Sequence, residues 1–200
     1  MRVPAILAFG LGTLLAPALS HAQHRQLGAH EHGRGTLNIA VEGKRISMEL
    51  EVPGVDIIGF EHEASTAPQK AALAKGEKQL LAPQALFKLP AGAGCIVSAA
   101  NVALEDEDPD HDHDKEAPAP GKSGEGAKEP AEHEEHHHSE FHAQYTFDCR
   151  APDKLTSIEF PYFRAFAGAQ RLDVNVITAK GQTKFEVSRD KPRIDLAGMM

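Results

Sequence analysis

The sequence is poor in several residue types on which common functions depend. Its 200 residues contain no tryptophan, only two cysteines and 6% aromatic side chains, and the excess of acidic over basic groups gives a formal net charge of -8 at pH 7. Nucleic acid and anionic membranes require a basic patch on their partners, and the sequence shows none. The acidic balance therefore argues against both as binding partners and favours a cationic one.

Enzyme motifs are equally scarce. The sequence has no Gly-x-Ser-x-Gly motif, no phosphate-binding glycine loop and no reactive-cysteine context. The metalloprotease pattern His-Glu-x-x-His occurs once, at residues 133–137, in a tract so rich in histidine and glutamate that composition explains it. That chemistry also requires a rigid helix, a third ligand and a substrate cleft. We therefore expect that the protein is not an enzyme.

Long apolar runs are absent apart from one near the N-terminus. Residues 5–19 form an apolar run after Arg2, which is interrupted by Pro17 and followed by small residues up to Ala22. A transmembrane helix needs about 20 apolar residues, whereas a shorter run before a small-residue cleavage site is typical of a secretory signal. We interpret residues 1–22 as a signal peptide cut near Ala22 and expect an exported, soluble mature chain without a membrane span.

The two cysteines are Cys95 and Cys149. In an oxidising compartment a lone pair is most simply a disulfide; a thiolate metal pair and two buried thiols are the alternatives. A bridge would enclose roughly 50 residues, for which the chain-entropy model gives on the order of 4 kcal/mol of stabilisation. The disulfide would then stabilise the fold regardless of the conformation of the enclosed segment.

What the sequence does contain is a pattern of strands. Apolar and polar residues alternate over residues 36–52 around a Glu-Gly-Lys turn, which predicts a hairpin, and the same pattern recurs later in the chain. Further strands are predicted at residues 95–104, 141–149, 155–160 and 172–176, and Phe185 and Val187 complete a closing hairpin across residues 180–182. One helix is predicted at 66–81 with Ser65 or Thr66 as its cap. We expect a mainly β domain with one helix, an antiparallel sheet or sandwich, built from residues 23–104 and 141–200.

A polar insert over residues 105–140 interrupts this domain. Its centre is mostly Pro, Gly, Ala, Lys and Glu, which cannot offset the entropy lost on folding, so we expect it to be disordered. Imidazole and carboxylate are ligands that zinc accepts, and imidazole also suits nickel and copper. Metal binding, with several Zn²⁺ ions per chain, is predicted for His111, His113, His133, His136, His137, His138 and His142. Ligands on a flexible loop should bind weakly and exchange quickly, which suits capture and hand-over.

A second candidate site precedes the first predicted strand. His30 and His32 are separated by one residue, so in an extended segment they point the same way with their bases about 7 Å apart. The segment Glu61-His62-Glu63 could supply the remaining ligands if the fold brings it near. We predict that His30, His32 and His62 contribute to a better ordered and tighter site than the insert offers.

Several segments occur together in a recognisable order. They are His30-Glu31-His32-Gly33, Leu37-Asn38-Ile39-Ala40-Val41, Gly59-Phe60-Glu61-His62, Gly94-Cys95, a His-rich acidic insert, His142-Ala143-Gln144-Tyr145-Thr146-Phe147-Asp148-Cys149, Phe163-Arg164-Ala165-Phe166 and Val174-Asn175-Val176-Ile177-Thr178. In this combination the chain resembles the ZrgA-like periplasmic zinc-uptake proteins over essentially its whole mature length. The resemblance implies a periplasmic zinc-binding accessory to uptake, working beside a zinc transporter or its solute-binding protein.

We therefore expect a periplasmic metallochaperone or scavenger that captures zinc and assists its uptake. A nickel or copper sequestration protein for metal resistance would use the same ligands, although the lack of a Met-rich run weakens copper(I). A zinc-bridged structural or adhesion module is the third alternative. It predicts zinc-dependent association, which would appear as growth in light-scattering mass, whereas otherwise we expect a monomer.

Overall fold

The computed structural model describes residues 31–107 and 138–200, which form mainly β-strands. The strands are β1 (Arg34–Glu42), β2 (Arg45–Pro53), β3 (Cys95–Glu107), β4 (His138–Cys149), β5 (Ser157–Glu159), β6 (Arg171–Thr178), β7 (Gly181–Ser188) and β8 (Arg193–Asp195). The helices are α1 (Gly54–Ile58), α2 (Ala67–Leu80), α3 (Pro83–Leu86) and α4 (Tyr162–Ala165), with short 3-10 helices at η1 (Ala91–Ala93) and η2 (Pro152–Lys154). The mainly β fold predicted from the sequence is confirmed.

Six strands form one sheet in the order β3-β4-β2-β1-β6-β7, and β5 pairs with β8 in a small second sheet. All neighbours in the large sheet are antiparallel except β1 and β6, which are parallel. A parallel pair needs a long crossover connection, and most of the chain lies between these two strands. The sheet is therefore mixed, a detail that short-range patterns in the sequence do not contain.

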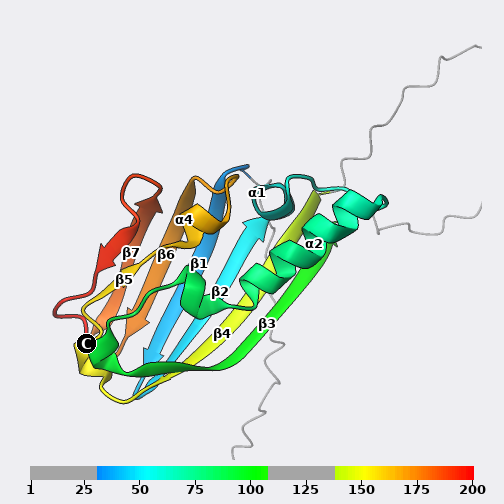
Figure 1. Ribbon diagram of the computed structural model, residues 1–200. Coiled ribbons are helices and arrows are strands. Elements are labelled where there is room, and N and C mark those ends of the chain that lie inside the picture. The colour runs from blue at the N-terminus through cyan, green and yellow to red at the C-terminus, as the bar shows by residue number, and fades with distance from the viewer. Residues whose placement is uncertain (1–30, 108–137) are drawn as a thin grey trace, which may run out of the picture.

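The strands separate a buried face from a polar one. On β1, Leu37 and Ile39 are buried, whereas the alternate residues Thr36 and Asn38 are partly exposed, as the period of two in a strand requires. Helices α1, α2 and α4 and strand β5 lie over the buried face (Figure 1). None of the helices in the two described ranges lies on the other face, which we call the open face.

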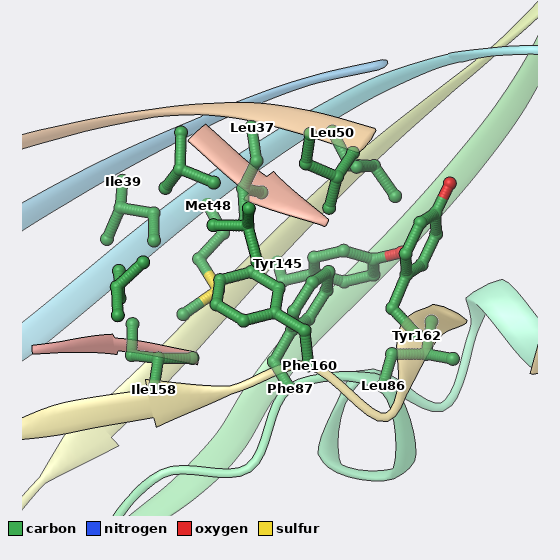
Figure 2. Close-up of a cluster of buried hydrophobic side chains, with 14 of the residues drawn as sticks. Leu37, Ile39, Met48, Leu50, Leu86, Phe87, Tyr145, Ile158, Phe160 and Tyr162 are labelled. Atoms are coloured by element: carbon green, nitrogen blue, oxygen red, sulfur yellow. The ribbon is translucent and has the colours of Figure 1, made fainter. Parts of the chain in front are cut away.

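Aromatic side chains fasten the covering layer to the sheet. The ring of Phe87 lies 5.8 Å from that of Tyr145, 5.9 Å from Phe160 and 6.3 Å from Tyr162. Figure 2 shows these rings packed between aliphatic side chains of the strands such as Met48. Aromatic pairs at such distances contribute about 0.5–1.5 kcal/mol each beyond the area they bury. The core thus holds together segments that are far apart in the sequence.

The helix predicted at residues 66–81 is α2, and its cap is Thr66. The Thr66 hydroxyl accepts a hydrogen bond from the Gln69 N–H, while the Gln69 side chain accepts one from the Thr66 N–H at 2.9 Å. This reciprocal pair is a capping box, and Gly76 and Leu80 are the buried residues of the helix. No helix within residues 31–107 and 138–200 is long and apolar enough to cross a membrane.

The disulfide predicted between Cys95 and Cys149 is confirmed, and it joins directly paired residues of β3 and β4. At the opposite end, β3 continues to Glu107 and β4 begins at His138. The insert inferred from composition, residues 105–140, therefore overlaps both strands. The strands extend into the polar insert because their backbones remain paired: Glu105 pairs with Glu140 and Glu107 with His138. Backbone hydrogen bonds between strands do not require apolar side chains.

Candidate metal centre

Two histidines and a glutamate from three separate segments converge. His32 Nε2 lies 3.0 Å from Glu61 Oε1, and His138 Nδ1 lies 2.9 Å from Glu61 Oε2. One possible ligand atom of each residue lies within 4.8 Å of those of the others. The Glu61 side chain is 13% exposed, against 59% for His32 and 43% for His138. The carboxylate therefore forms the floor of this three-residue site, and the imidazoles form its solvent side.

His32 is held by a tight turn in front of β1. The Arg34 N–H donates to the Glu31 carbonyl at 3.0 Å, and Gly33 inside the turn has a φ of 83°, a conformation that favours glycine. The Gly33 carbonyl accepts hydrogen bonds from the N–H groups of Gln170 and Arg171. The turn that carries His32 is thus fixed to the start of β6.

Glu61 lies in the segment between α1 and α2. Helix α1 ends at Ile58 and is capped by Gly59, which has a φ of 87° and turns the chain away from the helix axis. At the other end of α1, Gly54 lies so close to Ser139 that an added Cβ would collide with both its side chain and its carbonyl oxygen. This close approach brings α1 against the beginning of β4, and Glu61 with it to His138.

His138 is the first residue of β4, and strand geometry determines where it points. Ser139 is buried, whereas His138 and His142 are partly exposed. These alternate residues lie on the open face, because successive side chains of a strand point to opposite sides. His32 thus lies just before β1 and His138 begins β4, and in the sheet only β2 separates these two strands.

A buried carboxylate lies next to the site. Asp56 is 4% exposed, and its Oδ1 accepts a hydrogen bond of 2.8 Å from the Gly33 N–H. Its Oδ2 has no hydrogen-bond partner among the described residues. Burial raises the pKa of Asp56 above its ordinary value of 3.8, the Gly33 hydrogen bond and His32 lower it, and Glu61 raises it. Asp56 is thus electrostatically coupled to both His32 and Glu61 and directly supports the turn that carries His32.

The structure places the other histidines predicted as ligands elsewhere or does not describe them. His62 is exposed. Its Nδ1 lies 3.0 Å from the Glu63 carbonyl oxygen, and its Nε2 lies 3.3 Å from Gln69 Nε2. The His62 side chain therefore faces the start of α2 and not the three-residue site. His142 lies on the open face beside Glu105 and Glu140. The remaining predicted ligands lie outside the described residues: His30, His111, His113, His133, His136 and His137.

The sequence predicts that the segment Glu61-His62-Glu63 contributes ligands, and it names His62 as the individual site residue because imidazole is the more distinctive metal-binding group. The ring of His62 instead stacks on that of Phe60 at 5.1 Å, and the neighbouring carboxylate faces His32 and His138. Asp56 gave no recognisable signal, because an acidic residue in a short, partly apolar segment has many possible roles.

The donor set of the site fits zinc. Zinc takes imidazole nitrogen and carboxylate oxygen at about 2.0–2.2 Å in a tetrahedral shell. Atoms in such a shell lie about 3.4 Å from one another, close to the 3.0 Å and 2.9 Å that separate the Glu61 oxygens from the two imidazoles. Only small shifts would bring the three residues around one ion, and three protein ligands leave a fourth position for water or another donor.

Comparison with known families points in the same direction. A family model described as "ZrgA family zinc uptake protein" matches residues 29–196. The matched range includes His32, Glu61 and His138 as well as both cysteines, and it confirms the resemblance seen in the sequence. No curated protein matches the chain.

Proposed function

This chain belongs to the ZrgA family of zinc uptake proteins, and we propose that it captures zinc in the bacterial periplasm at the three-residue site and hands it on for uptake. The observation that carries the proposal is the Glu61 carboxylate, which has an imidazole 3.0 Å from one oxygen and another 2.9 Å from the other. Zinc is the cargo of this protein, and the role requires binding and release without chemical conversion.

The incomplete ligand set supports release as well as capture. Structural zinc sites are usually closed by four protein ligands, whereas sites that exchange a ligand keep one position open. The two imidazoles are partly exposed, so a histidine or carboxylate of a second protein could reach the ion. A periplasmic solute-binding protein or the zinc transporter itself is the partner that this role requires.

The insert adds a collecting function to the proposal. His136 and His137 immediately precede His138 in the sequence, so an ion captured there lies a few residues from a ligand of the three-residue site. Carboxylates among the insert histidines raise the local concentration of cations. We assign the insert to collection and the three-residue site to holding zinc in fixed geometry.

The test uses the full mature chain in which His111, His113, His133, His136 and His137 are replaced by glutamine, which we call the insert-silent variant. Competition with a chromophoric chelator then measures its zinc affinity. We expect tight zinc binding that Glu61→Gln or His138→Gln weakens by at least about tenfold, since even the loss of a group that supports a ligand costs 10- to 100-fold. A deletion of residues 105–140 would not serve, because it removes His138 and parts of β3 and β4.

His62→Gln is the matched control. His62 is the sequence neighbour of Glu61 but faces Gln69, so its replacement should leave the affinity unchanged. The proposal fails if Glu61→Gln and His138→Gln bind zinc as tightly as their parent. Loss of binding on His62→Gln alone would restore the ligand assignment made from the sequence. Tighter binding of nickel than of zinc would favour metal sequestration over zinc uptake.

A further inference from the structure

A groove lies in the layer that covers the buried face of the sheet, between β5 and α4 (Figure 1). Its volume is about 410 Å³, within the range of about 300–1,000 Å³ that is usual for small-molecule sites. Four cationic side chains and one carboxylate line it: Lys88, Arg164, Arg189, Arg193 and Glu159. The cations come from different parts of the chain, so no basic run marks this groove in the sequence. Folding thus concentrates positive charge at one place on a chain whose formal net charge is -8.

Strand pairing builds one side of the groove. The Lys88 N–H donates to the Glu159 carbonyl at 2.9 Å, and the Glu159 N–H donates to the Lys88 carbonyl at 3.1 Å. On its other side Glu159 pairs with Arg193 of β8. Directly paired residues point to the same face, and all three of these side chains are exposed, whereas Ile158 beside them is buried. The pairing therefore forms a surface row in which a cation lies on each side of one carboxylate.

Two of the arginines are held in fixed positions. Arg189 Nη2 donates to the carbonyl oxygens of Phe166 and Ala167, each at 2.7 Å. Arg193 Nη2 donates to the Ser157 hydroxyl at 3.1 Å. A guanidinium carries five N–H groups, and the Nε and Nη1 groups of Arg189 donate to no other residue in the part of the chain that the structure describes. Donors that are already fixed lose little conformational entropy when they bind an anion.

The other two cations have no partner of their own. Arg164 and Lys88 are exposed, and within residues 31–107 and 138–200 neither side chain forms an ion pair or a hydrogen bond. The carboxylate in the groove does not neutralise them, because Glu159 Oε1 lies 3.4 Å from Arg193 Nη1. The groove therefore has an excess of positive charge that the described protein groups leave uncompensated, and this excess favours a ligand with more than one negative group.

Apolar side chains form the rest of the wall. Phe160 and Phe163 line the groove from below and are 2% exposed, and Pro161 and Pro192 are partly exposed. The Phe160 N–H donates to the Pro192 carbonyl at 2.9 Å, and proline has no N–H. An inorganic anion would gain nothing from this apolar wall, whereas the hydrocarbon part of an organic anion can pack against it. The combination of walls thus favours an organic ligand.

We propose that this groove binds a small organic molecule with two or more carboxylate groups. Arg189 and Arg193 offer it fixed donors. The exposed side chains of Arg164 and Lys88 close on the bound carboxylates, which accept the charge-assisted hydrogen bonds that guanidinium and ammonium groups donate. This inference goes beyond zinc capture, since the groove shares no residue with the three-residue site and its ligand needs no metal.

The experiment titrates the metal-free mature chain with propane-1,2,3-tricarboxylate and follows ¹H–¹⁵N NMR signals. We expect saturable shifts of the side-chain Nε–H signals of Arg164 and Arg189, and weaker binding as the ionic strength rises. Arg164→Gln and Lys88→Gln should each weaken binding by at least about threefold, since each removes a charge-assisted hydrogen bond. Both side chains are exposed and unpaired, so these variants should fold normally.

Arg45→Gln and Lys184→Gln are the matched controls. Arg45 on β2 and Lys184 on β7 are exposed and lie outside the groove, so their replacement should leave the affinity for the tricarboxylate unchanged. Glu61→Gln should also leave it unchanged, so this inference and the zinc proposal can fail independently. Glycerol, which has the same carbon skeleton without the charges, should not bind.

Three results would overturn the inference. The first is the absence of saturable shifts with the tricarboxylate, or equal affinity in Arg164→Gln and Lys88→Gln. The second is binding of inorganic phosphate as tight as that of the tricarboxylate, which would make the groove a general anion site. The third is binding of a hexaglutamate peptide where the tricarboxylate does not bind, which would assign the groove to an acidic segment of a protein partner.

Discussion

Asp56 is the residue whose replacement tests the architecture of the candidate metal centre most directly. Its Oδ1 accepts the Gly33 N–H at 2.8 Å, and the residue is 4% exposed. Asp56→Asn retains an oxygen that can accept this hydrogen bond and removes the charge. Asp56→Ala removes both, and leaves a buried N–H without a partner.

The difference between the two variants isolates the hydrogen bond. A buried donor left without its partner costs about 1–3 kcal/mol, and for a chain of this size one kcal/mol shifts the melting temperature by about 2–4 °C. We therefore expect Asp56→Ala to melt about 2–12 °C below Asp56→Asn in differential scanning calorimetry without metal. Zinc affinity should follow the same order, because only the alanine variant loosens the turn that carries His32.

The pH dependence of the asparagine variant tests the charge. Burial raises the pKa of Asp56 above 3.8, which means that the folded protein takes up this proton more readily than the unfolded chain. Ionisation of Asp56 therefore lowers the stability of the parent as the pH rises from about 3.8 through the raised pKa, and asparagine removes this effect. We expect the melting temperature of Asp56→Asn relative to the parent to increase between pH 4 and pH 7. Equal melting of the alanine and asparagine variants, or a pH dependence of opposite sign, would refute this reasoning.

Three further predictions concern the fold and the ions. Replacement of Cys95 and Cys149 by serine should lower the free energy of unfolding, measured by calorimetry, by up to about 4 kcal/mol. Zinc binding at the three-residue site, measured by chelator competition, should remain. Loss of all zinc binding would contradict this prediction. Gly35→Ala should destabilise the protein by about 1–3 kcal/mol in a melting assay, since the new Cβ would lie 2.8 Å from the Glu51 carbonyl oxygen and closer still to a Val52 methyl group. Gly92→Ala is the control. Its new Cβ would have its nearest neighbour at 3.6 Å, so this variant should be nearly neutral in the same assay. Zinc affinity should fall sharply below about pH 6, because imidazole must be neutral to bind metal, and unchanged affinity at pH 5 in calorimetry would show that carboxylates alone suffice.

Local sequence signals predicted the elements of the fold well. Thr66 was a candidate cap because a hydroxyl before a helical segment can accept from the first N–H groups, and the capping box with Gln69 is present. A lone pair of cysteines in an exported chain predicts a disulfide, and Cys95 and Cys149 are bonded. The parallel pairing of β1 with β6 could not be predicted, since it depends on which distant segments share one core.

In the candidate site too, local sequence signals predicted some features and long-range packing decided the others. His32 was identifiable from its spacing to His30, a signal carried by neighbouring residues. The segment Glu61-His62-Glu63 was predicted as a source of ligands, but which of its side chains faces His32 and His138 depends on what the loop packs against. Here the close approach of Gly54 to Ser139 and the stacking of His62 on Phe60 direct the carboxylate toward His138.

The sequence by itself determined the chemistry of this protein: an acidic chain rich in imidazole and carboxylate, a disulfide-braced β domain and a family of zinc uptake proteins. These properties follow from composition, alternation and motif order, which are all encoded locally. Only the tertiary structure decided which ligands can share an ion. His32, Glu61 and His138 are far apart in the chain, and they meet because β1, β2 and β4 are neighbours in one sheet and α1 packs against the start of β4.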